Sequence, residues 1–519
     1  MTVSDGVTIW ILGDQLTHAH AALATRTPRD ARVLMIESRL RGTQHRYHKL
    51  KLVLVYSAMR HFAAELRARG WTVDYVPLEA NRTFDTAVRE HVAATGCRQL
   101  LMEEPNSFGE ADVVVALAEA AGVTLTRLPG TQFLITRDDF RDWATGQKRL
   151  LMEQHYRRLR RRFGWLMQPD GEPVGGAWNF DAENRATFAA WTKAGRPRPS
   201  ADLHESPDDV TREVMALVER EFPDHPGRAD RFWLPVDRAG AMRWLNVFVR
   251  ERLPRFGTFE DLMSADEPFL FHSVLSPLIN IGLLSPRECV EAAVSAYSRG
   301  EAPLNSVEGF VRQVIGWREF VNGVYWLRGP DYLQLNALEA TRPLPAWFYS
   351  GETPLNCLQQ VLRQTLDLGW NHHIQRLMVL SNFCLLSGIR PQDALRWFLE
   401  MYVDAFDWVM AANVIGMALH ADGGYMATKP YAASGAYIHK MSNYCQGCQY
   451  DPKQKAGPDA CPFNYLYWDF IDRHEARFAR NARILPMVRA WSGRAETDKA
   501  AVRRSAAEFL ETHVAHVGG

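Results

Sequence analysis

The sequence lacks several features that would assign it to a common class of protein. Its first residues, MTVSDGVTIWILGDQL, contain neither the basic segment nor the long apolar run of a secretory leader. No apolar stretch approaches the roughly 20 residues needed to span a bilayer. Lysine plus arginine and aspartate plus glutamate both number 60, so the net charge is zero and says nothing about nucleic acid. These absences predict a cytoplasmic protein without membrane contact, and we expect a monomer.

A dinucleotide-binding glycine motif is also missing, although the first part of the chain predicts an α/β domain. Nothing resembling G-x-G-x-x-G follows the first apolar run. Short apolar runs alternate with helical patterns and predict strands near 7–12, 32–38, 71–76, 98–104 and 123–128. This alternation indicates a parallel, Rossmann-like sheet, which binds ligands beyond the carboxyl ends of its strands.

At 519 residues the chain is too long for one hydrophobic core. We expect an α/β domain over 1–135, an interdomain helical connector and loop over 136–225, and a large all-α domain over 226–519. In the last of these, apolar residues recur at spacings of three and four. Residues 168–205 are rich in glycine, proline, asparagine and aspartate, which predicts a loop without regular structure.

Four of the seven cysteines are spaced like ligands of one metal centre. A C-x-x-C pair is followed within one loop by a third cysteine that precedes a proline, and a fourth lies far upstream. The four are Cys357, Cys445, Cys448 and Cys461. This pattern suits a single tetrahedral ion or a cubane cluster. The remaining cysteines lie in apolar segments, where we expect buried core residues: Cys97, Cys289 and Cys384.

A dense run of arginines occupies the predicted helical connector. Its members are Arg157, Arg158, Arg160, Arg161 and Arg162. Such a run suits contact with nucleic-acid phosphates, but a solvated helix between two domains has the same composition. Taken alone, the run favours the solvated helix.

Two segments of the helical domain place polar side chains on helices. FLFHSVLSPLINIG puts Ser273, the Leu275 backbone and Ser276 at a helix start, where free N–H groups can hold phosphate. SVEGFVRQVIGWREF interleaves charge with aromatic residues through Glu308, Arg312 and Trp317. Serine also caps helices that bind nothing, and surface ion pairs have the second pattern.

A third segment, GWNHHIQRLMVLSNF, opens a strongly apolar helix with His372 and His373, and Arg376 follows. Asp404 and Asp407 flank an aromatic-rich stretch downstream. A lone buried histidine is usually structural. Two adjacent histidines and an arginine at one helix start, facing carboxylates, are a better candidate for a site.

Together these segments resemble the photolyase/cryptochrome family over nearly the whole chain. HSVLSP, GWRE and HH-x-x-R occur in the order of the family's flavin-binding segments. The stretch from NVIGM through TKPYAASGAYI and MSNYCQGCQYDP to ACPFNYLYWDF is similar to the iron–sulfur bacterial branch, which includes the prokaryotic (6-4) photolyases. The resemblance implies light-driven repair of (6-4) pyrimidine–pyrimidone photoproducts in UV-damaged DNA, with the lesion flipped into a pocket beside FAD.

The resemblance also implies roles for individual residues. His373 matches the family's proton-donating histidine, with His372 beside it, and Arg376 matches an arginine that pairs with a carboxylate, here Asp404 or Asp407. The implied FAD-binding set is Ser273, Leu275, Ser276, Glu308, Arg312, Trp317, Arg376, Asp404, Asp407, Met410 and Asn413. The implied metal centre is a [4Fe-4S] cluster on the four cysteines, although their spacing alone also allows zinc. With the family in view, DNA contact by the arginine run and loop 175–185 becomes the favoured interpretation.

The chain departs from the family pattern at several positions. Trp397 and Tyr437 match an electron-transfer relay, but Tyr349 stands where a third tryptophan is expected. Met410 stands where a carboxylate near the flavin is expected, and a thioether can neither take up nor release a proton. Asp14 and Glu37 are the candidates for binding a 6,7-dimethyl-8-ribityllumazine antenna in the α/β domain.

Two other functions remain open at this point. A cryptochrome-type blue-light photoreceptor would use the same cofactors, and the altered residues Met410 and Tyr349 suit it. A zinc-containing nucleic-acid-binding protein without photochemistry would explain the cysteine spacing, but not the HSVLSP and HH-x-x-R segments.

Overall fold

The computed structural model describes residues 6–79 and 83–514. Its N-terminal unit is a five-stranded parallel sheet with the strand order β3-β2-β1-β4-β5. The strands are β1 (Val7–Trp10), β2 (Arg32–Ile36), β3 (Val73–Val76), β4 (Gln99–Glu103) and β5 (Thr124–Leu128). Each falls within a run that the sequence marks as a strand, so the predicted parallel α/β domain is confirmed.

Alternation along the strands separates the two faces of the sheet. Ile9 and Val33 join the core cluster that contains α3, whereas Trp10 and Leu34 join the cluster that contains residues of α4 and α5. The helices of this unit are α1 (Ala21–Ala24), α2 (Arg39–Thr43), α3 (Lys49–Ala68), α4 (Phe84–Thr95) and α5 (Phe108–Ala120). Strand order reverses between β1 and β4, which places a topological switch point at their carboxyl ends.

The connector contacts both units. Its helices are α6 (Arg137–Thr145), α7 (Met152–Phe163), η1 (Val174–Gly176), η2 (Asp181–Glu183), α8 (Phe188–Lys193) and α9 (Asp209–Glu221). Helix α9 packs along α3 of the α/β unit, and α7 packs against the helical unit. The expectation that 168–205 has no regular structure was wrong at α8, where Phe188 and Trp191 are buried.

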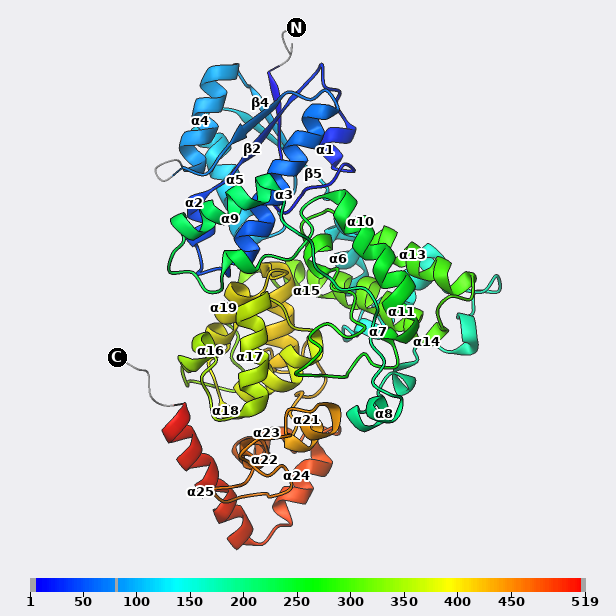
Figure 1. Cartoon of the computed structure of the whole chain (residues 1–519), viewed down its shortest axis with the longest axis vertical. Coiled ribbons are helices and arrows are strands. Elements are labelled where there is room, and N and C mark those ends of the chain that lie inside the picture. Colours follow the sequence, from blue (N-terminus) through cyan, green and yellow to red (C-terminus); the bar gives the residue numbers. More distant parts are fainter. Residues whose placement is uncertain (1–5, 80–82, 515–519) are drawn as a thin grey trace.

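The rest of the chain is helical, as predicted, and lies below the α/β unit in Figure 1. It begins with η3 (Ala229–Arg231), α10 (Arg238–Val247), η4 (Phe248–Arg252), α11 (Leu253–Phe256), α12 (Ser276–Asn280), α13 (Pro286–Ser298), α14 (Leu304–Val311), η5 (Arg312–Arg318) and α15 (Glu319–Arg328). It continues with η6 (Pro330–Gln334), α16 (Trp347–Ser350), α17 (Asn356–Leu368), η7 (Gln375–Ser381), α18 (Asn382–Ser387), α19 (Pro391–Met401), α20 (Asp407–Ala411) and η8 (Ala412–Ala418). It ends with α21 (Gly435–Met441), α22 (Pro462–Arg473), α23 (Glu475–Phe478), α24 (Leu485–Ser492) and α25 (Glu496–His513).

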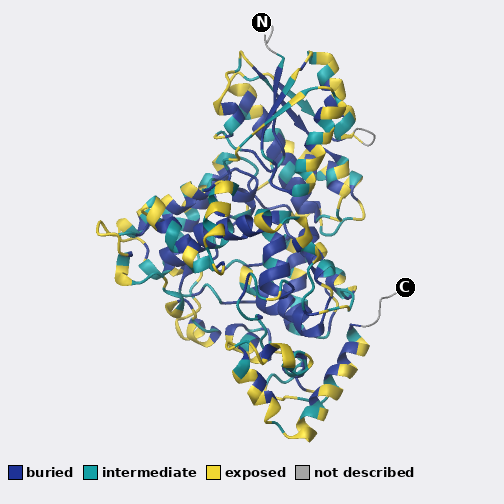
Figure 2. Cartoon of the chain, turned by 180° about the vertical axis from the view of Figure 1, so that it is seen from behind, coloured by how far each residue is buried: buried dark blue, intermediate teal, exposed yellow. Residues whose placement is uncertain are grey.

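Buried residues run without interruption from the sheet into the helical unit (Figure 2). His48, just before α3, is fully buried and joins the two units through hydrogen bonds. Its backbone N–H donates to the Glu400 carbonyl at 2.7 Å, and its Nε2–H donates to the Leu366 carbonyl at 2.9 Å. Lys51 Nζ donates to the Ala405 carbonyl at 2.6 Å. Within the described ranges, no helix is long and apolar enough to cross a membrane.

Candidate functional site

Asp404 is the meeting point of three segments that are far apart in the sequence. Its Oδ1 accepts a hydrogen bond from Arg376 Nη1 at 2.9 Å, and its Oδ2 accepts from Arg376 Nη2 at 3.1 Å and from Ser276 Oγ at 2.6 Å. Its backbone carbonyl accepts from Asn280 Nδ2 at 2.9 Å. The HSVLSP and HH-x-x-R segments are therefore held against one buried carboxylate, and the guanidinium also stacks on Tyr402 at 3.9 Å.

The chain just before α12 has an unusual backbone. Val274 has a φ of +55°, a left-handed conformation that β-branched residues rarely adopt. Ser273 Oγ accepts a hydrogen bond from the Leu275 N–H at 3.5 Å. Strain of this kind persists where the surrounding structure enforces it, and it concentrates at binding sites.

The GWRE segment joins the same region through an arginine. Arg318, on η5, stacks over Trp408 at 5.0 Å and over Phe133 at 4.3 Å, and its Nη1 donates to Glu319 at 3.2 Å. Helix α15 packs against α20 and η8, and η7 packs against η8. The three segments singled out in the sequence thus surround one region of the helical unit.

Three of the four π-helical segments among the described residues coincide with these motifs. Segment η5 contains Arg312 and Trp317, η7 contains Arg376, and η8 contains Asn413. A π-helical turn is rare and occurs frequently at functional sites. This coincidence marks the region as a site independently of its side chains.

The two adjacent histidines have different surroundings. The His373 side chain is exposed to solvent, yet the protein around it lowers its pKa to about 4, first through burial and then through Arg376. His372 is buried and stacks on His272, with ring centroids 4.0 Å apart, and neither of its ring nitrogens has a partner among the described residues. Burial holds its pKa well below the ordinary value.

Glu308 and Arg312 are tied to the connector. Glu308 is fully buried and accepts hydrogen bonds from Tyr156 Oη at 2.8 Å and from the Phe180 N–H at 3.1 Å. Burial raises its pKa to about 7. Arg312 pairs with Asp181 and lies 3.4 Å from Glu308 Oε1. These contacts hold loop 175–185 against the helical unit. Trp317 is half-buried and packs edge-on against Phe320.

Asp407, Met410 and Asn413 lie on α20 and η8. Asp407 is separate from the Arg376 pair, because it faces Arg41 and Lys51 of the α/β unit. Burial, followed by the Glu110 carboxylate, raises its pKa. Met410 is buried, and Asn413 Nδ2 donates to the Val409 carbonyl at 2.8 Å. Of the two carboxylates that the sequence left open for Arg376, the structure joins Asp404 to it.

The predicted electron-relay residues are not in ring contact with one another among the described residues. Trp397 is fully buried, and its indole Nε1 donates to the Phe348 carbonyl at 3.1 Å. Rings do continue from it through Phe348 to Trp347, with centroid distances of 5.3 and 4.7 Å. Tyr349 donates to Glu400 at 2.6 Å, and Tyr437 is hydrogen-bonded to Asp261 at 3.3 Å.

The two antenna candidates lie at strand ends, as expected, but within the part of the chain that the structure describes they bond to different partners. Glu37 is buried, and its oxygens accept from Arg60 at 2.7 and 3.1 Å, from Tyr75 at 2.5 Å and from the Leu78 N–H at 2.8 Å. Asp14, near the switch point, accepts from Asn106 at 2.9 Å. Burial and then Glu110 raise the pKa of Asp14 to about 7.

The arginine run does not form a single surface. Arg160 is fully buried, and its guanidinium donates to the backbone carbonyls of Trp165, Leu166 and Trp178. Its assignment as a DNA-contacting residue was therefore wrong, because it cannot reach a phosphate without unfolding the loop that it holds. The other four are partly or fully exposed: Arg157, Arg158, Arg161 and Arg162. Arg161 stacks on Trp178 at 4.5 Å, and Arg157 does so at 5.3 Å.

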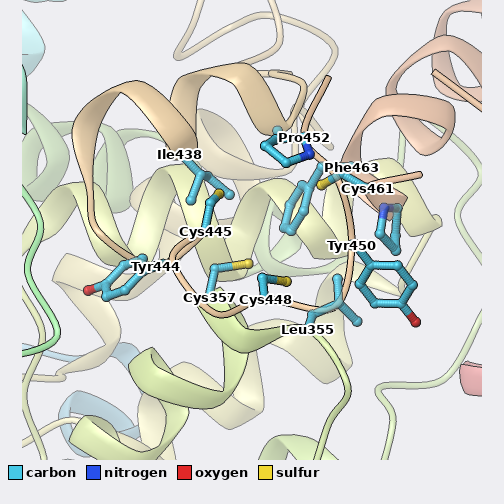
Figure 3. A pocket seen from close by; sticks show the side chains of 12 residues that line it. Leu355, Cys357, Ile438, Tyr444, Cys445, Cys448, Tyr450, Pro452, Cys461 and Phe463 are labelled. Carbon is cyan, nitrogen blue, oxygen red and sulfur yellow. The ribbon is translucent and has the colours of Figure 1, made fainter. Parts of the chain in front are cut away.

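All four predicted cysteine ligands line one pocket (Figure 3). Cys357 comes from α17, Cys461 caps α22, and Cys445 and Cys448 lie in the loop between α21 and α22. The wall is otherwise apolar and includes Leu355, Ile438 and Phe463. A Cβ atom on Gly435 would lie 2.7 Å from Cys461 Sγ, so this backbone must approach the sulfur closely.

The four thiols are gathered but are not arranged around one ion. Across the described ranges, no three histidine, cysteine, aspartate or glutamate side chains are placed to hold a single metal ion. A single zinc ion would bring each sulfur to about 2.3 Å from one centre. Burial, and then the three neighbouring thiols, raise the pKa of Cys357 well above its ordinary value.

Several residues that build the site carried no clear signal in the sequence. Asn280 lies four residues after Ser276, so helical spacing could have placed both near Asp404. Two further contacts join residues that are far apart in the sequence. His272 stacks on His372, 100 residues away, and Asp181 pairs with Arg312, 131 residues away, so no local sequence pattern could predict either contact.

The chain consists of an α/β unit, a long connector and a helical unit, and its HSVLSP, GWRE and HH-x-x-R segments surround one buried region. This combination defines a photolyase-like protein. Residues 9–234 match the family model for deoxyribodipyrimidine photo-lyase-related proteins. A (6-4) photolyase of Agrobacterium fabrum is 42% identical over 508 residues, which are 97% of this chain and 98% of that protein.

Solved structures agree with the fold. A bacterial class III photolyase from Agrobacterium tumefaciens has a TM-score of 0.57 and 15% identity, covering 97% of both chains. A cryptochrome from Synechocystis has a TM-score of 0.55 and 14% identity, covering 84% of this chain and 88% of its own. The chain belongs to the photolyase/cryptochrome family.

Proposed function

We propose that this chain repairs (6-4) photoproducts in UV-damaged DNA by a light-driven reaction. The observation that carries the proposal is the placement of the exposed His373 beside Arg376, which Asp404 fixes. This repair requires a positioned proton donor, because the hydroxyl group carried by the 5′ base must return to the 3′ base as the bond between the two bases breaks. Full-length similarity to a protein named (6-4) photolyase supports the same reaction.

The proposed cofactor is FAD, which when bound and reduced supplies the photoexcited electron. The region around Asp404 suits such a ligand, since both ring nitrogens of the buried His372 lack partners within the described part of the chain. Ser273, Ser276, Arg376 and Asp404 are the proposed contacts. Glu308 and Arg312 face the connector loop. We therefore assign them to the side of the pocket that receives the lesion, rather than to contact with the phosphates of the cofactor.

His373 must gain its proton on binding. Its pKa of about 4 leaves the imidazole neutral at pH 7 in the unliganded protein. The negative phosphates of DNA and cofactor raise the pKa of a nearby histidine, because they favour its charged form. The reactive protonation state therefore depends on an assembled complex.

We further propose a [4Fe-4S] cluster on Cys357, Cys445, Cys448 and Cys461. The gathering of all four cysteines at one largely apolar pocket supports a shared metal cluster. Its first role would be structural, because metal–thiolate bonds would join the start of α17 to the loop before α22. We also propose a lumazine antenna near the buried Asp14, which lies close to the switch point of the sheet.

For DNA, we propose contact through Arg157, Arg161 and Arg162 together with loop 175–185. Trp178 from this loop stacks under two of these guanidinium groups. The Glu308 contact holds this loop against the helical unit, which supports a DNA surface beside the proposed lesion pocket.

The test is blue-light repair of a defined (6-4) photoproduct in a short oligonucleotide, with reduced holoenzyme and a dark control. We expect light-dependent restoration of the thymines. His373→Ala should abolish repair while lesion affinity is retained, and the exposed His439→Ala should repair normally. No repair by a protein with full FAD and photoreducible flavin would overturn the proposal and favour a blue-light photoreceptor.

A further inference from the structure

A second cavity lies apart from the flavin region and the cysteine pocket. It measures about 350 Å³, which is within the range of small-molecule sites. Its wall comes from the loop 336–342, the turn 388–391 between α18 and α19, Leu419, and Arg473 and His474 at the end of α22. Helices α18 and α22 pack against each other beside it (Figure 1). None of the roles assigned above uses these residues.

Two guanidinium groups converge on one point of this wall. A Cβ atom on Gly388 would lie 3.0 Å from Arg342 Nη1 and 3.6 Å from Arg473 Nη1. Gly388 has a φ of +68°, so a side chain is disfavoured there and the backbone stays open to the cavity. Two like charges held this close create a strongly positive position.

Backbone carbonyls at the end of α18 account for only part of the hydrogen bonding of these two guanidinium groups. Arg342 Nη1 donates to the Ser387 carbonyl at 2.9 Å, and Arg473 Nη2 donates to the Leu386 carbonyl at 2.5 Å. Such contacts are common at the negative end of a helix. A guanidinium has five N–H donors, however, so each arginine retains others.

The charge balance at this position is positive. Arg473 is paired with Asp469, Nε to Oδ2 at 2.7 Å. Arg342 has no carboxylate within ion-pair distance anywhere in residues 6–79 or 83–514. The carboxylate of Glu339 also belongs to the wall, but that residue is exposed and no ion pair joins it to either arginine. The Asp469 carboxylate also attracts Arg342, so the two guanidinium groups share one paired carboxylate and carry an excess of positive charge.

Another part of the wall is apolar, although Asn336 and Thr341 also line the cavity. Leu338, Leu385, Ile389 and Leu419 are each at most 8% exposed, and all four line the cavity. Burial, followed by Arg473 and Arg477, lowers the pKa of His474 to about 4, so its ring is neutral at pH 7. The cavity therefore suits a ligand with one anionic group, which would lie at the two arginines, and an apolar body, which would pack on these apolar residues.

We propose that this cavity binds a small organic anion, whose carboxylate or phosphate pairs with Arg342 and Arg473 over Gly388 while its apolar body packs on Leu338, Ile389 and Leu419. The site is separate from catalysis. It does adjoin the end of α22, the helix that begins at Cys461, so its occupancy would stabilise the C-terminal part of the chain.

The test is isothermal titration of the holoenzyme with three probes: phenyl phosphate, inorganic phosphate and phenol. Phenyl phosphate should bind saturably with a Kd of about 1 mM or tighter. Inorganic phosphate lacks the apolar body and should bind at least about tenfold more weakly, and phenol should not bind. Absence of saturable phenyl phosphate binding would overturn the proposal.

Variants then locate the binding. Arg342→Gln should weaken phenyl phosphate about tenfold or more, because it removes a charged hydrogen-bond donor. Ala340→Trp places a bulky side chain in the cavity wall while both arginines are retained, and it should also abolish binding, which guards against a folding defect in the first variant. Arg390→Gln, an exposed neighbour already paired with Asp393, should bind normally. Wild-type affinity in both Arg342→Gln and Ala340→Trp would show that the probe binds elsewhere and would overturn the assignment.

Discussion

Arg376 and Asp404 form a two-point ion pair, with N–O distances of 2.9 and 3.1 Å, between segments 28 residues apart. The side chains are 13% and 8% exposed, so water compensates neither charge well. Because Ser276 and Asn280 also bond to Asp404, this one carboxylate orients three segments. Its removal should therefore disturb ligand binding and folding together.

Asp404→Ala leaves the Arg376 guanidinium buried without a partner. We expect the free energy of unfolding to fall by about 3–5 kcal/mol and bound flavin to be lost. Denaturant titration and the ratio of flavin to protein absorbance measure the two effects. Asp407→Ala is the matched control and should keep its flavin, since Asp407 faces the α/β unit. Equal flavin loss in both variants would contradict the central place of Asp404.

Cys445→Ser should remove a ligand of the proposed cluster. The expected result is loss of iron and of broad visible absorbance, with a lower melting temperature, because the cluster ties α17 to the C-terminal loop. Cys384→Ser is the control, since Cys384 is fully buried on α18 but does not line the pocket. Its iron content should be unchanged even if its stability falls. Full iron content in Cys445→Ser would argue against this ligand set.

Arg160 and Arg161 are neighbours with opposite expected effects. Arg160→Gln removes donors to three buried carbonyls and should lower the melting temperature by several degrees. Arg161→Gln should leave stability unchanged, weaken binding to DNA of any sequence, and reduce the slope of log K against log salt by about one. Thermal melts and fluorescence anisotropy at several salt concentrations distinguish them. If the salt dependence of DNA binding in Arg161→Gln has the same slope as in the wild type, Arg161 does not contact DNA.

Acid should destabilise the protein through buried neutral histidines. Burial lowers the pKa of His48 from an ordinary 6.5 to about 4, so the unfolded chain binds its proton first as pH falls. Between pH 6.5 and pH 4 the unfolded chain binds more protons than the folded chain. The free energy of unfolding must therefore decrease as the pH falls from 6.5 towards 4. By pH 4, one such histidine lowers the free energy of unfolding by on the order of 3 kcal/mol. Urea titrations of wild type and His48→Gln should show a shallower pH dependence in the variant, and identical slopes would contradict this.

Flavin photoreduction should depend on Trp397 and Trp347 more than on Tyr349. Rings connect Trp397 through Phe348 to Trp347, whereas Tyr349 is bonded to Glu400. Trp397→Phe and Trp347→Phe should each slow photoreduction under blue light, with a smaller effect from Tyr349→Phe. The absorbance decay of oxidised flavin gives the rates. Undiminished photoreduction in Trp397→Phe would rule out this relay.

The sequence was sufficient for the architecture because strand and helix periodicities are local. All five strands and the helical remainder follow from apolar spacing. The choice between Asp404 and Asp407 could not be made in this way. The two carboxylates lie three residues apart across the start of α20, and only tertiary packing turns one towards Arg376 and the other towards Lys51.

The error at Arg160 has a simple geometric cause. Successive residues of a helix are about 100° apart, so five arginines within six positions cannot share one face. The buried face of α7 consists of His155, Tyr156, Leu159 and Arg160, at spacings of three and four. Those apolar neighbours indicated that Arg160 would turn inwards, where it needs carbonyl acceptors.

The π-helical segments have a consequence for how the site tolerates change. Each π-turn contains one residue more than an α-turn, so side chains before and after it are shifted in phase by about 100° relative to an uninterrupted helix. Deleting one residue from η8 would restore ordinary winding and rotate Asn413 and its neighbours away from their present direction. Length, as much as residue identity, is therefore under constraint in η5, η7 and η8, and a single-residue deletion there should be more damaging than most substitutions.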